Sequence, residues 1–490
     1  TKVRNTQLCS ARRPVERPSG GAPRRRARAI MTSSWDDLRA ALASLADAFG
    51  NQAVEELEAE GDVGSSAARA LSDAIAGEPR GSGRRAAEVA WARLQDGVGW
   101  TTPAWRECYV LGQLREATEA GEDAAAAASA EKGTEGDDGE GTRGALLRRA
   151  MLAVDMAHIM GGPGEIVQRF GRAIEAIIRE DRTGSEITGD VALIPDVLPP
   201  RAAVTIDPEH ALERAEGITA KEFKRDYFNA DKPVCLGNLG GSWPALAKWR
   251  DLRWLAREHG HRNVPLEVGA YDDAANWKEE VMLLSSFVDE YLIPGLRKEL
   301  AGEDEGRSRR IAYLAQHQLF EQLPGLLSDF DPPAVCDVAG GVQRVNAWIG
   351  TAGTVTPCHF DSYDNLLGQV AGYKFVRLYL EDDSPFLYRH QGAWAENRSW
   401  PGDEDRANGD GDGGGPGEGN RVAMGKPRRD AQGNISRVDV ERPDLERFPL
   451  FAKATHTDVV LGPGEFIYIP ARCWHYVRAL TTSVSLNFLF

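Results

Sequence analysis

Apolar and polar residues in the first third of the chain alternate with the period of an α-helix. Apolar residues recur every three or four positions from Leu38 to Phe49, and at every fourth position from Ile166 to Ile178. A stripe with this spacing covers one face of a helix and buries it against a neighbour. The pattern predicts an α-helical domain over residues 34–183, which we expect either to bind a partner or to cap the rest of the protein.

In the second half of the chain, the pattern changes to the period of two that is typical of β-strands. In the run KFVRLYL, alternate residues from Lys374 to Leu380 would lie on the inner face of a sheet. The runs TVTPCHF and EFIYIP share this strand character, and amphipathic helices are expected earlier in the same half. The alternation predicts an α+β chain with a sheet in residues 218–490, which could fold into a barrel.

Three segments interrupt these patterns. Residues 119–143 contain GEDAAAAASAEKGTEGDDGEG, a low-complexity tract that we expect to be a flexible insertion in the helical domain. Residues 184–217 are rich in proline and turn formers, which predicts a linker. Residues 392–434 are dominated by glycine and aspartate, and we expect a second disordered insertion there. The Asp-Gly alternation lacks the terminal glutamate of an EF-hand calcium loop.

The N-terminal residues 1–33 are basic and contain a single acid, Glu16. This composition predicts a disordered arm, and it also fits a nuclear import signal or an organellar transit peptide. A mispredicted start is a further alternative, because Met31 opens a better-patterned sequence. Because a nuclear import signal is one of these alternatives, we expect a location in the nucleus, in the cytoplasm or in both.

The overall composition limits the possible partners. The formal net charge of −16 argues against general or sequence-specific nucleic-acid binding but is compatible with basic protein segments. The six cysteines are scattered without a C-x-x-C pair, which favours free thiols in a reducing compartment. No apolar run is long enough to predict a membrane span.

A candidate metal site stands out against this background. His359 and Asp361 are two residues apart in a strand-like run, so both side chains would lie on one face. His475 follows an apolar strand, and closure of the sheet into a barrel could bring it to the other two. Two imidazoles and one carboxylate, with positions left open, are the usual protein ligands of a non-haem Fe(II) oxygenase.

Lys374 strengthens this interpretation. It opens the inner row of the run KFVRLYL, and a lysine in an otherwise apolar row is costly to bury unless it meets an anion. A dicarboxylate that chelates iron at one end would present its other carboxylate to this ammonium group.

At this point the chain resembles the JmjC (Jumonji C) family, and most closely its arginyl-hydroxylase, lysine demethylase 8-like branch. The resemblance covers residues 218–490. It rests on the metal motif, on Asn365 and Lys374, and on the segments YLAQHQLF, NAWIG, VERPDLERFPLFAKA and WHYVRAL. It implies a cupin-type double-stranded β-helix, a jelly-roll barrel with flanking helices, that uses Fe(II), 2-oxoglutarate and dioxygen.

The resemblance also implies roles for individual residues. The implied iron ligands are His359, Asp361 and His475. The implied contacts of 2-oxoglutarate are Tyr313, Trp348, Thr356, Asn365 and Lys374. The implied lining of the substrate pocket is Glu267 and Trp277, where a carboxylate and an indole could hold a guanidinium group. His317 is expected to make ordinary hydrogen bonds, because a fourth protein ligand would exclude the co-substrate.

The function implied by the resemblance is a protein hydroxylase that acts on arginyl side chains, with succinate and CO2 as co-products. Its partners would be proteins or peptides with basic side chains, such as histones or other chromatin-associated or ribosomal proteins. The alternatives are a histone lysine demethylase, a histone-tail endopeptidase, and a JmjC-fold binding scaffold without catalysis. The chain departs from the branch at Leu489 and Phe490, where relatives carry tryptophans, and this puts substrate shape and selectivity in doubt.

Overall fold

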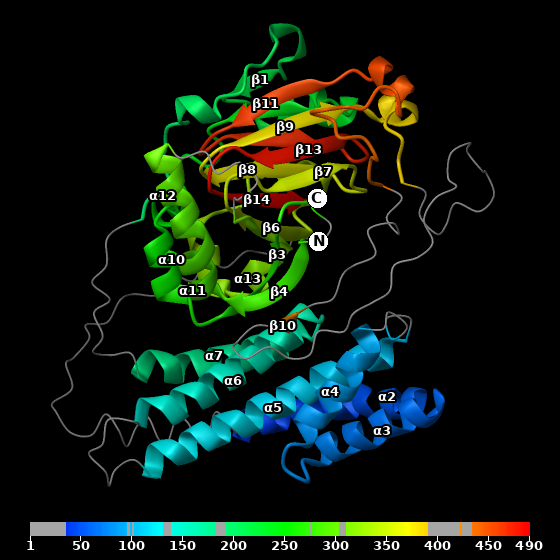
Figure 1. The fold of residues 1–490 in the computed structure, drawn as a ribbon, viewed down its shortest axis with the longest axis vertical. Coiled ribbons are helices and arrows are strands. Elements are labelled where there is room, and N and C mark those ends of the chain that lie inside the picture. The colour runs from blue at the N-terminus through cyan, green and yellow to red at the C-terminus, as the bar shows by residue number, and fades with distance from the viewer. Residues whose placement is uncertain are drawn as a thin grey trace, which may run out of the picture.

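The computed structural model describes residues 36–95, 99, 102–130, 139–181, 192–271, 273, 276–302, 310–390, 422–423 and 434–490. Within these ranges, a layer of helices lies beneath a β-barrel, as Figure 1 shows. The basic arm expected at residues 1–33 falls outside the described part. A search of the described helices finds none long and apolar enough to cross a membrane.

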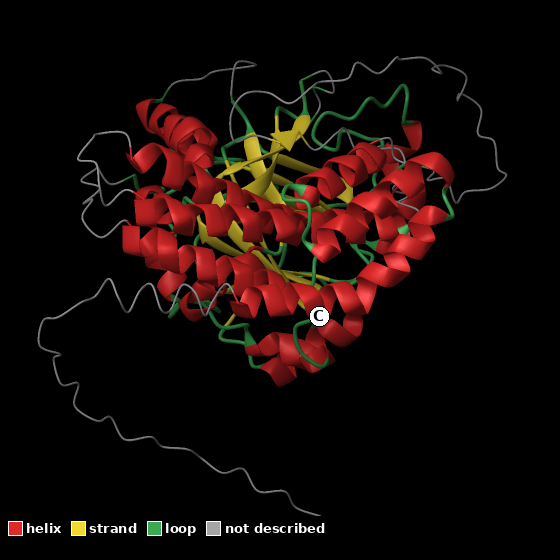
Figure 2. Cartoon of the chain, turned by 90° about the horizontal axis from the view of Figure 1, so that it is seen from below, coloured by secondary structure: helices red, strands yellow, loops and turns green. Residues whose placement is uncertain are grey.

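The N-terminal half is α-helical, as predicted. After helical residues 36–45, its helices are α2 (Asn51–Glu58), α3 (Gly61–Ala76), α4 (Ser82–Gln95), α5 (Pro103–Ala130), α6 (Gly139–Ile159) and α7 (Gly164–Asp181). Their apolar faces meet in one core that includes Leu71, Trp105 and Val154. Viewed from below, these helices form a layer across the strands (Figure 2).

The C-terminal half is built mainly of strands, with short helices on one side. The helices are α8 (Ala220–Asp226), α9 (Pro244–Lys248), α10 (Leu252–His259), α11 (Leu284–Phe287), α12 (Ile293–Ala301) and α13 (Leu319–Gln322). Helix α8 begins with a capping box, in which Thr219 and Glu222 satisfy each other's backbone N–H groups.

The strands form two sheets that face each other as a cupin barrel. In the described residues, the larger sheet has ten strands, in the spatial order β1 (Arg214–Glu216), β2 (Val234–Gly237), β12 (Phe466–Ile469), β8 (Asn365–Ala371), β14 (Ser483–Leu489), β6 (Arg344–Gly350), β5 (Ala312–His317), β3 (Asn263–Val268), β4 (Lys278–Leu283) and β10 (Val422–Ala423). The smaller sheet has the order β11 (Thr457–Leu461), β9 (Lys374–Tyr379), β13 (Trp474–Ala479) and β7 (Val355–His359).

Alternation along the strands separates the barrel interior from its outer face. On β14, Val484, Leu486 and Phe488 join the core between the large sheet and the flanking helices. The intervening Ser485 and Asn487 are buried on the opposite face, toward the interior of the barrel. The interior of the barrel holds a separate apolar cluster that includes Leu367, Val376 and Ile467, and the polar part beside Asn487 contains the candidate site.

The structure corrects the expected insertion at residues 119–143. Helix α5 continues to Ala130, and Ala120 and Ala124 are buried in the helical core. Alanine has the highest helix propensity, so the alanine run extends the helix instead of breaking it. Helix α6 begins at Gly139, and residues 131–138 lie outside the described part.

Two further expected boundaries differ. The expected linker at residues 184–217 contains β1, which pairs in parallel with β2, so its second half belongs to the barrel. Within the expected insertion at residues 392–434, β10 pairs with β4, and Asn434 donates a hydrogen bond to the Phe360 carbonyl. Most of that segment lies outside the described residues.

Candidate metal centre and co-substrate pocket

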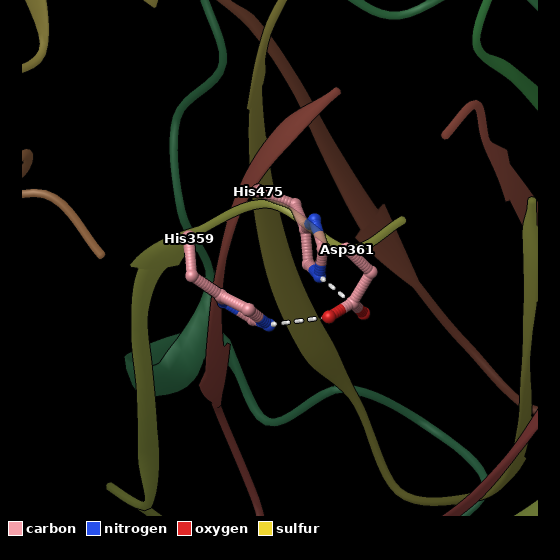
Figure 3. Close-up of side chains that lie close together, drawn as sticks. All are labelled: His359, Asp361 and His475. Atoms are coloured by element: carbon pink, nitrogen blue, oxygen red, sulfur yellow. Dashed lines mark ion pairs between the residues drawn. The ribbon is translucent and has the colours of Figure 1, made fainter. Parts of the chain in front are cut away.

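The structure brings His359, Asp361 and His475 together at one end of the barrel (Figure 3). His359 ends β7, and β7 pairs with β13 so that His359 lies directly opposite His475. Asp361 follows β7 by two residues. The Nε2 atoms of His359 and His475 lie 3.9 and 3.8 Å from the two carboxylate oxygens of Asp361. One potential ligand atom from each residue lies within 4.8 Å of the other two.

Both imidazoles are held in the orientation that a metal requires. The Nδ1 atom of His359 lies 2.9 Å from the Pro357 carbonyl, and that of His475 lies 3.1 Å from the Cys473 carbonyl. Because a carbonyl only accepts, each Nδ1 carries the proton and each Nε2 offers a lone pair toward Asp361. Burial, reinforced by the neighbouring imidazole, lowers the pKa of His475 to about 4, so this ring is neutral at pH 7.

The loop before β13 holds the segment that carries Asp361. The N–H of Arg472, in the loop before β13, donates to the Asp361 carbonyl at 2.7 Å. The Ala471 N–H of the same loop donates to the carboxylate of Asp364 at 3.3 Å, and the Tyr468 hydroxyl of β12 donates to it at 2.7 Å. Two imidazoles and a carboxylate are a donor set that fits Fe(II).

Lys374 lies deeper in the barrel, with only 1 % of its surface exposed. Its ammonium group donates to the Tyr313 hydroxyl at 3.2 Å and lies 5.4 and 6.0 Å from the ring centroids of Tyr313 and Trp348. No carboxylate of the described residues forms an ion pair with it. Burial lowers the pKa of Lys374 to about 7. A cation in such a pocket is suited to an anionic ligand.

Tyr313 is placed by its strand neighbours. It lies opposite Gly350 of β6, where an added Cβ would approach the tyrosine ring to 2.6 Å, so only glycine leaves room for the ring. Thr356 of β7 is a hydrogen-bond partner of its hydroxyl, and burial raises its pKa. Tyr313, Thr356 and Lys374 therefore form one connected polar group across the two sheets.

A second chain of contacts joins the other two predicted co-substrate residues. The Trp348 indole N–H donates to Asn487 at 2.9 Å, and Asn487 donates to Asn365 at 3.2 Å. Asn487 was not predicted from the sequence. The alternation in SVSLNFLF could have indicated it, because Ser483, Ser485 and Asn487 share one face of β14.

The two predicted substrate residues lie on neighbouring parts of the same sheet. Glu267 of β3 is half-buried and lies directly opposite Tyr313 of β5. Its charge helps to raise the pKa of Tyr313. Trp277 is buried and directly precedes β4, whose first residue, Lys278, lies opposite Val268. The structure thus places Glu267 beside Tyr313 and Trp277 near the end of β3, the strand that carries Glu267.

Two predictions outside the metal site have different outcomes. His317 forms a hydrogen bond with Gln322 at 2.8 Å, as expected for an ordinary buried histidine. The prediction that Leu380 faces inward is wrong. Strand β9 ends at Tyr379, the chain turns into a 3₁₀ segment (Glu381–Phe386), and Leu380 is 50 % exposed.

Comparison with known proteins identifies the class. Residues 220–490 match the family model described as a Cupin-like domain. The chain therefore belongs to the cupin-like JmjC family of 2-oxoglutarate-dependent oxygenases, as the resemblance implied.

Two of the similar relatives align with most of the chain, and a third with little more than half of it. JmjC domain-containing protein F of Dictyostelium discoideum is 29 % identical over 457 residues, which cover 82 % of this chain and 86 % of the relative. Lysine-specific demethylase JMJ30 of Arabidopsis thaliana is 29 % identical over 474 residues, with 90 % and 92 % covered. Lysine-specific demethylase 8 of Xenopus tropicalis is 31 % identical over 286 residues, with 58 % and 53 % covered.

Proposed function

We propose that the protein is an Fe(II)- and 2-oxoglutarate-dependent hydroxylase that acts on arginyl side chains of protein substrates. The observation that carries this proposal is the combination of a His-Asp-His cluster with a buried, unneutralised lysine in one barrel. A metal site alone is compatible with many reactions. The lysine adds a binding partner for the distal carboxylate of a chelating dicarboxylate.

The roles of the chain's own residues follow from their positions. His359, Asp361 and His475 would hold Fe(II), and Lys374, with Tyr313, Thr356, Asn365 and Trp348, would hold 2-oxoglutarate. When bound, iron, 2-oxoglutarate and dioxygen supply the oxidising chemistry, which yields succinate and CO2 and inserts one oxygen atom into a substrate C–H bond. The protein orients the reactants and excludes water from the pocket.

Arginine is favoured as the target by the acid beside the pocket. Glu267 lies opposite Tyr313, so a side chain that reaches the metal passes near a carboxylate. A guanidinium group can form paired hydrogen bonds with a carboxylate and can stack on an indole such as Trp277. A methylated ammonium group has fewer N–H donors and gains less from that carboxylate.

Mass spectrometry of peptides incubated with enzyme, Fe(II) and 2-oxoglutarate tests the proposal. We expect arginine peptides to gain one oxygen atom, with one succinate formed for each oxygen. Glu267→Gln should reduce this gain about tenfold while succinate formation without peptide stays nearly unchanged. Arginine peptides without added oxygen, across a panel of basic substrates, would contradict the assignment.

A second candidate, lysine demethylation, is favoured by the names of two of the relatives. It would use the same metal and co-substrate on an N-methyl group. In the same experiment, methyl-lysine peptides would lose a methyl group and release formaldehyde, and arginine peptides would be unchanged. We further propose a nuclear or cytoplasmic location, which suits the five described cysteines because all are buried free thiols.

A further inference from the structure

A second cluster of buried charges lies at the contact between the helical layer and the barrel. Arg262, next to the start of β3, and Asp155, near the C-terminal end of α6, are 3 % and 0 % exposed. Glu175 of α7 and Gln322 of α13 complete the cluster. None of these residues touches the candidate metal centre, and the proposed reaction does not use them.

Asp155 accepts hydrogen bonds from five donors. Its Oδ1 atom accepts from the Arg262 Nε and Nη2 atoms at 2.9 and 2.6 Å and from the Gln322 amide at 2.7 Å. Its Oδ2 atom accepts from the Asn263 backbone N–H at 2.6 Å and from the Asn263 side-chain amide at 3.2 Å. Every partner is a donor, so this position requires a carboxylate. An asparagine would turn an N–H group toward other N–H groups.

These contacts fix the beginning of β3. Asp155 holds the N–H of the first residue of the strand, and the Gln322 amide donates to the carbonyl of that same residue at 2.7 Å. Both backbone polar groups of Asn263 are therefore bound by side chains from helices. Arg262, directly before it, is bound by Asp155 and by Glu175 at 2.8 Å.

The strand continues from this anchor to the proposed substrate site. Asn263, Pro265 and Glu267 lie on one face of β3 because alternate residues share a face. Pro265 lies opposite Val281, whose side chain joins the core of the helical domain. Glu267 is four residues after Asn263, which is about 13 Å along the strand, and it lies opposite Tyr313. One face of β3 thus packs on the helices at one end and faces the pocket at the other.

We propose that Asp155 is a positioning residue for the substrate site, through which the helical domain sets the place of Glu267 along β3. This inference rests on the proposed function for the role of Glu267. The helical domain is then an integral part of the catalytic unit and not only a recruitment module. Two rigidly packed elements joined at a buried carboxylate transmit a small displacement along a strand.

The nearly isosteric variant Asp155→Asn tests the proposal in a chain that contains both the helical domain and the barrel. We expect amide hydrogen exchange over residues 263–268 to become faster, and the KM for an arginine peptide to rise about tenfold. Succinate formed per oxygen transferred should also rise, because the peptide is placed less well. Mn(II) affinity and the KM for 2-oxoglutarate should stay within about twofold of the unmodified protein, because their residues lie elsewhere.

Glu116→Gln is a matched control. Glu116 of α5 is also buried, at 6 % exposed, and pairs with Arg84 and Arg149 within the helical domain. Its loss should lower stability without changing exchange in β3 or the peptide KM. If Asp155→Asn unfolds the protein, Gln322→Met, which leaves the Arg262–Asp155 pair intact, should give a smaller change in the same direction.

Two results would overturn the inference. One is unchanged exchange at residues 263–268 in a folded Asp155→Asn or Gln322→Met variant. The other is the same profile in Asp155→Asn and Glu116→Gln, which would make the effect one of general stability. If the unmodified protein does not hydroxylate arginine peptides, the proposed function fails, and hydrogen exchange still decides whether Asp155 fixes β3.

Discussion

Two cations are buried among the described residues, Arg262 and Lys374, and they differ in how their charge is neutralised. Arg262 meets two carboxylates, Asp155 and Glu175, and although burial opposes it, these acids raise its pKa. Lys374 meets a tyrosine hydroxyl and two ring faces, and burial lowers its pKa to about 7.

The difference indicates what each cation is for. A buried charge that the fold neutralises itself belongs to the architecture, since its partners are part of the same chain. A buried charge that the fold leaves unneutralised is unfavourable until an anion arrives. By this criterion Arg262 belongs to the contact between the helical layer and the barrel, and Lys374 is the cation that we propose binds a ligand.

The largest effects are expected beside Lys374, at the metal cluster. His359→Ala and Asp361→Ala should each abolish succinate formation and weaken Mn(II) binding, because each removes one of three ligands. Titration calorimetry with Mn(II) and a succinate assay measure the two effects. His210→Ala, which changes a half-buried histidine that stacks on His456 and is not part of the cluster, is the control. Normal turnover in both site variants would remove the metal assignment.

Lys374→Ala should raise the KM for 2-oxoglutarate by about 30-fold or more, because it removes one partner of a buried charge pair. Mn(II) affinity should change much less, since Lys374 does not contact the cluster in the structure. An equal loss of Mn(II) and 2-oxoglutarate affinity would show that Lys374 supports the structure of the barrel. Lys374 would then have a structural role, as Arg262 has.

The contrast in stability is sharper still when both cations are replaced by methionine. Arg262→Met should lower the free energy of unfolding by about 3–5 kcal/mol, because it leaves Asp155 and Glu175 buried without a counter-charge. Lys374→Met should leave the stability of the ligand-free protein equal or higher, because it removes a desolvated charge. Urea unfolding without 2-oxoglutarate measures both. Equal destabilisation would mean that the two cations have the same structural role.

The candidate site was largely predictable from the sequence, because its signals are local. The spacing of His359 and Asp361 defines one face of a strand, and Lys374 opens an apolar inner row on another. His475 follows an apolar strand, and the resemblance to JmjC sequences supported the barrel that brings it close. Leu380 was misplaced because the pattern does not show that β9 ends at Tyr379.

The role of Asp155 could not be predicted in this way. Its partners Arg262 and Asn263 lie 107 and 108 residues further along the chain, and no periodicity links an α6 residue to a strand. The prediction of a flexible insertion at the alanine run, which forms the end of α5, was wrong for a different reason. Low complexity suggested a loop, but helix propensity and burial of Ala120 and Ala124 favour a helix.

The smallest expected effect is a pH dependence to which Lys374 contributes and Arg262 does not. Its pKa is about 7 in the fold and about 10.5 when unperturbed, so between these values the unfolded chain holds a proton that the folded chain has released. The contribution of Lys374 to stability therefore rises with pH across this window, and its penalty is complete below it. Arg262 stays charged in both states and contributes nothing there.

Binding of 2-oxoglutarate should reverse this shift, because a carboxylate beside Lys374 favours the ammonium form. Above pH 7 the protein would then take up a proton as the ligand binds, and affinity would fall by up to about tenfold per pH unit. Titration calorimetry at pH 8 in two buffers of different ionisation enthalpy measures this uptake. It should vanish in Lys374→Met and persist in Glu116→Gln. The absence of proton uptake in the unmodified protein would show that Lys374 is already charged before the ligand arrives, as Arg262 is.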